Sequence, residues 1–253
     1  MKKSWVITKL YLQLLLEGAH AFLSLLFVRM TGADRVLPWL QDRAARWARR
    51  AVRISGGRVR VEGLEKIPTD GPVLYVANHQ GVFDIPIMMG HLPGSPAFVA
   101  KKELFRIPLL GYWMKRIGCI GLDRENPRVA IQQIKDAAEG VKGGRRMVLF
   151  PEGTRSRAAD GAMGPFKRGS LKLAFLADAQ VVPVTVEGSR FLLSSEWPNG
   201  FTGDVKLIIS DPVAVAELDA EAQKALPDVL HDLISENRKR HHLGAISSEV
   251  VAL

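Results

Sequence analysis

Cysteine is the scarcest side chain in this sequence, with Cys119 as its single representative, so no disulfide can form within the chain. The sequence also lacks a Cys/His cluster at zinc-ligand spacing, a phosphate-binding P-loop and a dinucleotide-binding glycine fingerprint. It lacks the Gly-x-Ser-x-Gly elbow of the α/β-hydrolases as well. These absences argue against a disulfide scaffold, a zinc protein, a nucleotide-dependent enzyme and a serine-acylating lipase, and they fit a cytoplasmic setting.

Acidic residues are outnumbered. The chain has 26 Asp and Glu against 35 Lys and Arg, which gives a net charge of +9 and an isoelectric point near 9.8. Such a charge favours an anionic partner: a nucleic acid, an anionic bilayer or a phosphorylated substrate. No basic stretch interleaved with aromatic residues is present, whereas apolar and basic segments crowd the first 54 positions. The composition therefore favours a membrane over a nucleic acid.

At 253 residues the chain can bury one sizeable core, and two large domains would be cramped. No internal repeat or low-complexity linker divides it. We expect three regions: N-terminal apolar and basic amphipathic helices over residues 1–55, an α/β domain over residues 56–215, and a helical tail over residues 216–253.

The first segment, Trp5 to Val28, is mostly apolar and long enough to be considered as a transmembrane helix. No small-residue cleavage site follows it, so we interpret it as a retained anchor rather than a signal peptide. Glu17 at mid-span would be costly in hydrocarbon unless it faced protein or water. A full transmembrane span stays open. The polar residues share one helical face: Lys9, Gln13, Glu17, His20 and Ser24.

The second segment, Val36 to Ile54, has the pattern of a basic amphipathic helix. It sets Trp39 and Trp47 against several arginines, an arrangement suited to the headgroup layer of an anionic leaflet. The alternative is that both N-terminal segments merely cover the core of the protein. The arginines are Arg43, Arg46, Arg49, Arg50 and Arg53.

After Gly56 and Gly57, short apolar runs alternate with turn residues and amphipathic helices, which predicts an α/β fold. One predicted helix begins with Asn126 as its cap and Pro127 in its first turn. Another runs from Lys167 to about Asp178, and the segment from Glu217 to His242 reads as a charged helix interrupted at Pro227. The predicted strands are residues 58–61, 73–77, 97–100, 119–122, 147–150, 181–186 and 205–209.

The first candidate site is Asn78-His79-Gln80-Gly81-Val82-Phe83-Asp84, where a buried strand ends and a helix begins. A carboxylate close to an imidazole can hold one ring nitrogen and leave the other free to take a proton from a hydroxyl. His79 and Asp84 are therefore a candidate general-base pair. Alternatively, Asp84 simply caps the helix that contains Pro86, and His79 satisfies a turn.

The second candidate site is Phe150-Pro151-Glu152-Gly153-Thr154-Arg155-Ser156, again directly after a strand. Gly153 permits close backbone approach, while Thr154 and Arg155 supply a hydroxyl and a guanidinium suited to phosphate oxygens. Its alternative interpretation is an ordinary polar surface turn. Between the two sites a further strand ends in Asp123-Arg124, and two arginines at strand ends can clamp one phosphate.

The three blocks, in this order and spacing, resemble the glycerolipid acyltransferase family, specifically its 1-acylglycerol-3-phosphate acyltransferase branch. Phe166-Lys167-Arg168-Gly169 and Val182-Pro183-Val184 add to the resemblance, which covers roughly residues 58–190. It implies a single mixed sheet of about seven strands flanked by helices, often preceded by a helical membrane anchor. The middle region is then the acyltransferase catalytic domain.

The resemblance also implies residue roles: His79 is the base and Asp84 its orienting partner. The acceptor's glycerophosphate is then bound by residues at several strand ends, with Cys119 a core residue and not a nucleophile. One departure is Gly121-Leu122, where the family more often has an aromatic residue and Ile. The implied substrate-binding residues are Lys101, Arg124, Glu152, Gly153, Thr154 and Arg155.

The activity that this resemblance implies is transfer of a fatty acyl group from acyl-CoA or acyl carrier protein to the sn-2 hydroxyl of 1-acylglycerol-3-phosphate, making phosphatidic acid. The transfer is direct, without an acyl-enzyme, a cofactor or a metal. We expect the protein at the cytoplasmic face of the cell membrane, held by its N-terminal helices. Two alternatives stay open: another lysolipid acceptor such as a lyso-ornithine lipid, and a non-catalytic membrane-binding relative.

Overall fold

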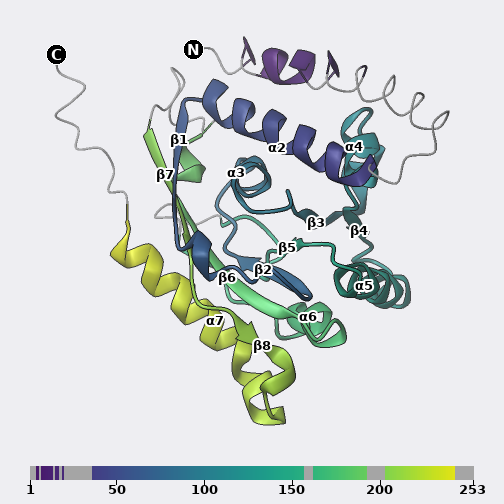
Figure 1. Cartoon of the computed structure of the whole chain (residues 1–253), viewed down its shortest axis with the longest axis vertical. Coiled ribbons are helices and arrows are strands. Elements are labelled where there is room, and N and C mark those ends of the chain that lie inside the picture. Colours follow the sequence, from purple (N-terminus) through teal and green to yellow (C-terminus); the bar gives the residue numbers. More distant parts are fainter. Residues whose placement is uncertain are drawn as a thin grey trace.

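The structure is a computed structural model of the chain (Figure 1). It describes residues 4–5, 7–13, 15–16, 19, 36–156, 162–192 and 203–242. The predictions for Glu17, His20 and Ser24, and for the last part of the tail, lie outside the described residues. Of the helices that are described, none is both long enough and apolar enough to cross a bilayer.

A mixed β-sheet forms the centre of the molecule, in the order β1-β7-β6-β2-β5-β3-β4. The strands from β6 to β4 run parallel, while β7 is antiparallel to β6, and β8 adds a short antiparallel pairing to the start of β6. The bounds are β1 (Gly57–Glu62), β2 (Val73–Ala77), β3 (Ala97–Lys101), β4 (Ile120–Leu122), β5 (Met147–Leu149), β6 (Gln180–Glu187), β7 (Gly203–Ile209) and β8 (Val213–Ala214).

Helices cover both faces of the sheet (Figure 1). On one face α2 (Val36–Ile54) crosses over α3 (Asp84–His91), next to α4 (Leu110–Arg116). On the other face lie α5 (Pro127–Lys142), α6 (Lys172–Leu176) and α7 (Ala220–Arg240). Short 3₁₀ turns complete the described chain: η1 (Leu64–Lys66), η2 (Lys102–Arg106), η3 (Arg168–Leu171), η4 (Ser189–Phe191) and η5 (Val215–Glu217).

The central strands carry the core because helices shield them on both sides. All of β2 is buried, and β6 is buried from its second residue onward. A parallel strand covered on both faces is expected to be a continuous apolar run, which is how Val73-Leu74-Tyr75-Val76-Ala77 reads. The α/β prediction is therefore confirmed at its centre.

One face of α2 belongs to the same core. Leu40, Ala44 and Ala48 recur every four residues and are buried, so they form a stripe along the helix. The small side chains allow close approach to α3, where Arg49 donates a 2.7 Å hydrogen bond to the carbonyl oxygen of Gly90. For this face of α2, the interpretation that the segment covers the core is confirmed.

The predicted strands are all present, with ends that lie within two residues of the predicted ones, and among the described residues the two-residue β8 is the strand that was not predicted. The helix beginning at Asn126 is confirmed, since the Asn126 side chain accepts a hydrogen bond from the Val129 amide and Pro127 stands in the first turn. The helix expected from Lys167 begins instead as η3 and becomes α-helical in α6. The interruption expected at Pro227 is wrong, because α7 continues through it.

Candidate active site

The candidate site lies where the parallel strands end. Because the carboxyl ends of parallel strands share one edge of the sheet, segments distant in sequence meet there. His79 follows β2, Arg124 follows β4, Phe150 follows β5, and Lys101 is the last residue of β3. The two motifs are joined directly, since the Ser156 amide donates a 2.9 Å hydrogen bond to the His79 carbonyl oxygen.

His79 and Asp84 form the pair that their spacing predicted. Asp84 Oδ2 lies 2.6 Å from His79 Nδ1 and also accepts hydrogen bonds from the amides of Gln80 (2.7 Å) and Gly81 (2.9 Å). The Asp84 side chain is fully buried, whereas that of His79 keeps 16% of its surface exposed. The carboxylate therefore fixes one ring nitrogen, and the ring remains accessible to a substrate.

Phe150 supports the other side of the imidazole. Its ring stacks on that of His79 with a centroid separation of 4.2 Å and an interplanar angle of 18°. An aromatic plane on one side and a hydrogen-bonded carboxylate at Nδ1 leave the ring little freedom to rotate. The first residue of the second motif thus helps to orient the imidazole of the first.

Glu152, which the resemblance assigns to acceptor binding, lies next to the loop that carries His79. Its two carboxylate oxygens accept hydrogen bonds from the amides of His79 (2.8 Å) and Gly164 (2.9 Å), and the side chain is buried. Burial raises the pKa of this carboxyl above its ordinary value, against the lowering effect of the two amides. Glu152 therefore holds the backbone of the His79 loop, and its role in acceptor binding stays a prediction.

Cations gather around Gly153. Arg124 donates a 2.6 Å hydrogen bond to the Gly153 carbonyl oxygen. The backbone φ of Gly153 is +69°, and a Cβ at this position would come within 2.9 Å of Lys167 Nζ. The positive φ therefore favours glycine here, whereas the flexible end of Lys167 could move aside from a Cβ. With Arg155 exposed next to it, this loop concentrates positive charge near His79.

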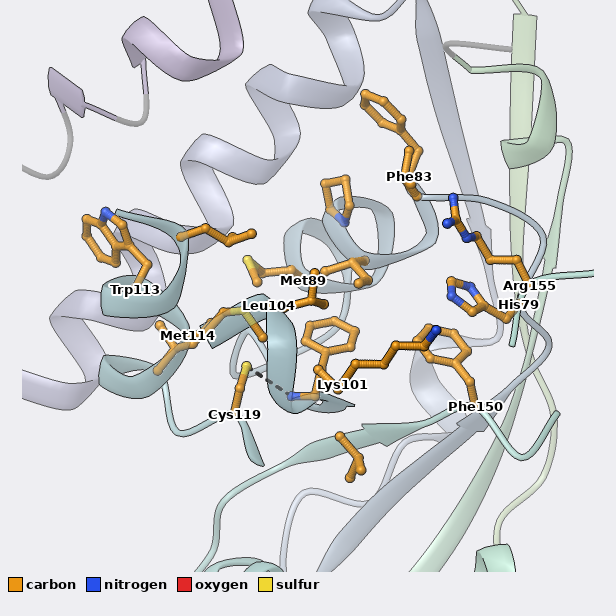
Figure 2. A pocket seen from close by; sticks show the side chains of 18 of the residues that line it. His79, Phe83, Met89, Lys101, Leu104, Trp113, Met114, Cys119, Phe150 and Arg155 are labelled. Atoms are coloured by element: carbon orange, nitrogen blue, oxygen red, sulfur yellow. Dashed lines mark hydrogen bonds between the residues drawn. The ribbon is translucent and has the colours of Figure 1, made fainter. Parts of the chain in front are cut away.

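A cavity of about 900 Å³ lies between the His79 loop and the loop that carries Gly153. His79 and Arg155 lie at one end, and Lys101 extends toward them (Figure 2). Trp113, Met114 and Cys119 lie at the opposite end (Figure 2). Of the predicted site residues, the cavity is lined by His79, Lys101, Arg124, Gly153, Thr154 and Arg155.

A family model described as Acyltransferase matches residues 58–187, which include both motifs and the strands that carry them. The chain belongs to the acyltransferase family.

Individual members of the acyltransferase family are similar to this chain. The 1-acyl-sn-glycerol-3-phosphate acyltransferase BAT2, chloroplastic, of Brassica napus is 36% identical over 171 residues, which are 65% of this chain. The chain spans only 48% of that relative's length. The 1-acyl-sn-glycerol-3-phosphate acyltransferase of Pseudomonas aeruginosa is 29% identical over 79% of each chain.

A solved structure shares the fold. It is the crystal structure of the 1-acyl-sn-glycerophosphate (LPA) acyltransferase PlsC from Thermotoga maritima, with a TM-score of 0.72 and 26% sequence identity. The match covers 91% of this chain and 97% of that one. The expected mixed sheet flanked by helices is thereby confirmed as an acyltransferase fold.

Cys119 lies in the apolar wall of the cavity. Its Sγ accepts a 3.3 Å hydrogen bond from the Phe98 amide (Figure 2), and burial raises the pKa of the thiol to about 12. A thiol that stays protonated is a poor nucleophile. Within the described ranges, no group of three or more His, Cys, Asp and Glu side chains is placed to hold a metal ion.

Sequence reasoning assigned no role to three polar residues at this site. Gln80 and Ser189 are buried next to Asp84, and Lys167 lies against Gly153. A usable signal existed for Ser189, because Gly188-Ser189 follows β6 directly at the same edge of the sheet. The contacts of Gln80, Ser189 and Lys167 depend on which strands are neighbours in the sheet. The sequence of a single segment does not show the order of the strands.

Proposed function

We propose that this chain transfers a fatty acyl group from a thioester to the sn-2 hydroxyl of 1-acylglycerol-3-phosphate, making phosphatidic acid. The observation that carries the proposal is the position of the His79–Asp84 pair, at the junction of a cluster of cations and a deep apolar cavity. The names of its relatives, which act on 1-acylglycerol-3-phosphate, support the same reaction.

His79 acts as the general base. With Nδ1–H donated to Asp84, Nε2 has a free lone pair and accepts the proton of the substrate hydroxyl as its oxygen attacks the thioester carbonyl carbon. The tetrahedral intermediate collapses by breaking the carbon–sulfur bond, and the imidazolium gives the proton to the departing thiolate, which leaves as the free thiol. The acyl group passes directly to the acceptor, so no acyl-enzyme forms.

The cations bind the acceptor's phosphate. Arg124 and Arg155 stand at the ends of different strands, so one phosphate between them is held from two directions. Lys101 adds a third positive charge, and the exposed hydroxyl of Thr154 adds a hydrogen-bond donor. Holding the phosphate at this end fixes the distance from the glycerol hydroxyl to His79.

The apolar end of the cavity takes a fatty acyl chain. Phe98, Trp113 and Met114 supply apolar walls, and the space extends under α2 to Ala44 and Trp47. The donor is acyl-CoA or acyl carrier protein, whose thioester supplies the activated carbonyl. The reaction as written needs no cofactor and no metal ion.

The protein works at the cytoplasmic face of the membrane, bound through its N-terminal segments. Exposed apolar side chains of the first segment, such as Leu12, Leu15 and Leu16, suit the acyl boundary. The arginine-rich face of α2 suits anionic headgroups. Both the acceptor and the product are amphipathic, so a site at the membrane surface shortens their path.

The test is an assay of the purified full-length chain with acyl-CoA and acyl carrier protein donors and a panel of lysolipids, with products identified by mass spectrometry. We expect phosphatidic acid from 1-acylglycerol-3-phosphate, with a kcat/KM above that for every other acceptor. Preference for a lyso-ornithine lipid would contradict the acceptor assignment and leave the chemistry intact. Vesicle binding with no turnover on any pair would identify a non-catalytic relative.

A further inference from the structure

Asp84 is held by a residue outside the two motif loops. Its Oδ1 accepts a short hydrogen bond from Ser189 Oγ, while its Oδ2 takes His79 and the two loop amides. Ser189 belongs to η4, which follows β6, and its side chain is fully buried. The carboxylate that orients the base is thus fixed from a different strand at its second oxygen.

The hydroxyl proton of Ser189 goes to Asp84. Ser189 Oγ also lies 3.3 Å from Gln80 Oε1, but a hydroxyl has only one proton to donate. Hydrogen bonds to an ionised acceptor are stronger than bonds to a neutral one, so the carboxylate takes the proton. Gln80 instead donates through Nε2 to Glu187 Oε2 at 2.8 Å.

Side chains join the ends of β2 and β6, so Ser189 is held in place. Asn78 donates to the Val186 carbonyl oxygen (2.9 Å) and accepts from the Val186 amide (2.8 Å). Glu187 pairs with Arg238 of α7 at 2.9 Å, with both side chains buried. Buried ion pairs stabilise a fold only weakly on balance, because desolvating both charges is costly. The ion pair and the Asn78 hydrogen bonds instead fix the position of the turn between β6 and η4, where Ser189 lies.

We propose that Ser189 is a positioning residue for acyl transfer, which keeps the Asp84 carboxylate aligned on His79 Nδ1. This inference rests on the general-base role proposed for His79. Without Ser189, one oxygen of a fully buried carboxylate loses its donor, and the carboxylate can rotate away from the imidazole. The loss falls on the proton-transfer step, whereas the cations that bind the phosphate are untouched.

The experiment measures kcat, and KM for both substrates, of full-length Ser189→Ala, Ser189→Thr and Ser189→Val. Thr and Val have the same shape and differ in the hydroxyl that the proposal requires. We expect Ala and Val to lower kcat by about ten-fold or more with each KM within about two-fold, and Thr to retain most of the activity. Ser95→Ala is the control, because it removes a buried hydroxyl before β3, at the opposite edge of the sheet.

Equal kcat in the Thr and Val variants, or a Ser189→Ala enzyme of near-normal kcat, would overturn the proposal. Failure of all three variants to fold would also overturn it, because a purely structural role would then be sufficient. His79→Ala, measured beside them, separates the two levels of inference. If His79→Ala stays active, both the general-base role and the Ser189 proposal are wrong. If it is inactive while Ser189→Ala is normal, only the Ser189 proposal fails.

Discussion

Glu152 and Arg155 are three positions apart in one motif, yet their side chains have different surroundings. A carboxylate beside a bound phosphate would repel it, and the Glu152 oxygens face the amides of His79 and Gly164 instead. Arg155 stays exposed at the polar end of the cavity. Sequence spacing could not separate the two roles, because both residues follow the same strand.

Arg155→Ala should weaken acceptor binding. Loss of one of the guanidiniums that we propose to clamp the phosphate should raise KM for 1-acylglycerol-3-phosphate by roughly ten-fold or more, since bonds between charged groups are the strong ones. Steady-state kinetics at saturating donor measure this. Arg128→Ala, an exposed arginine on α5 outside the cavity, is the matched control. An unchanged KM in the Arg155 variant would remove that residue from the phosphate site.

Cys119 should resist alkylation in the folded protein. Burial raises the pKa of its thiol from 9.0 to about 12, so at mildly alkaline pH the folded thiol stays neutral while the unfolded one begins to ionise. The contribution of Cys119 to the free energy of unfolding is therefore constant below pH 9. It is lost as the pH rises from 9 toward 12, because only the unfolded thiol ionises in that range. Iodoacetamide labelling read by mass spectrometry should be slow without denaturant and fast in urea. Equal rates would contradict the assigned burial.

At the scale of elements, α4 packs against η2 without room for a side chain at Gly111. A Cβ there would lie 2.1 Å from the carbonyl oxygen of Phe105, which as backbone cannot move aside easily. Trp113 and Met114 of the same helix form the apolar wall of the cavity. The contact therefore sets the position of that wall.

Gly111→Ala should separate α4 from η2 and destabilise the fold by about 1–3 kcal/mol, the usual cost of overpacking. Denaturant unfolding checks this value. Gly143→Ala is the control: its Cβ would make only ordinary contacts, at 3.4 Å or more, so its effect should stay within about 0.5 kcal/mol. A Gly111 variant as stable as the parent would show that the wall can move.

Much of the fold could be predicted because a buried parallel strand has a continuous run of apolar residues in the sequence. The strand β2, for example, has the predicted bounds, residues 73–77. Pro227 shows the limit of local rules. Its missing N–H costs α7 one hydrogen bond, but Leu226, Leu230 and Ile234 of the same helix are buried, and their packing outweighs that loss. The strand β8, at two residues, is too short to show an alternating pattern.

The site was predictable where its residues share a loop and was missed where they do not. His79 and Asp84 are five positions apart, so their pairing depends on one turn. Ser189 reaches Asp84 across 105 positions, through the pairing of β2 with β6. Such contacts follow from strand order, which the apolar pattern of each strand leaves undetermined.

At the scale of the whole molecule, the excess positive charge should direct the protein to anionic membranes. Arg46, Arg50 and Arg53 of α2 reach the surface, while α5 and its basic residues lie on the other face of the sheet (Figure 1). If net charge alone directed membrane binding, arginines and lysines on either face would contribute equally. Comparing charge reversals on α2 with charge reversals on α5 therefore tests whether α2 provides the membrane-binding surface.

Replacing Arg46, Arg50 and Arg53 together with Glu should weaken binding to anionic vesicles by about a hundred-fold or more, at about 1 kcal/mol per cation near the surface. Raising the salt concentration should weaken binding of the unchanged protein in the same direction. Co-sedimentation with anionic and neutral vesicles measures both. The matched control replaces Arg128, Lys135 and Lys142 of α5 with Glu, and an equal loss in both triple variants would assign the effect to net charge alone.

The acyl transfer that we propose for the whole molecule depends on His79 as the base. Its most direct test is the turnover of His79→Ala with 1-acylglycerol-3-phosphate and the preferred donor, beside His241→Ala at the end of α7 as the matched control. A positioned base contributes about a hundred- to ten-thousand-fold in rate, so the His79 variant should lose at least that much in kcat while remaining folded, and the control should not. Near-normal turnover by folded His79→Ala would contradict the general-base role.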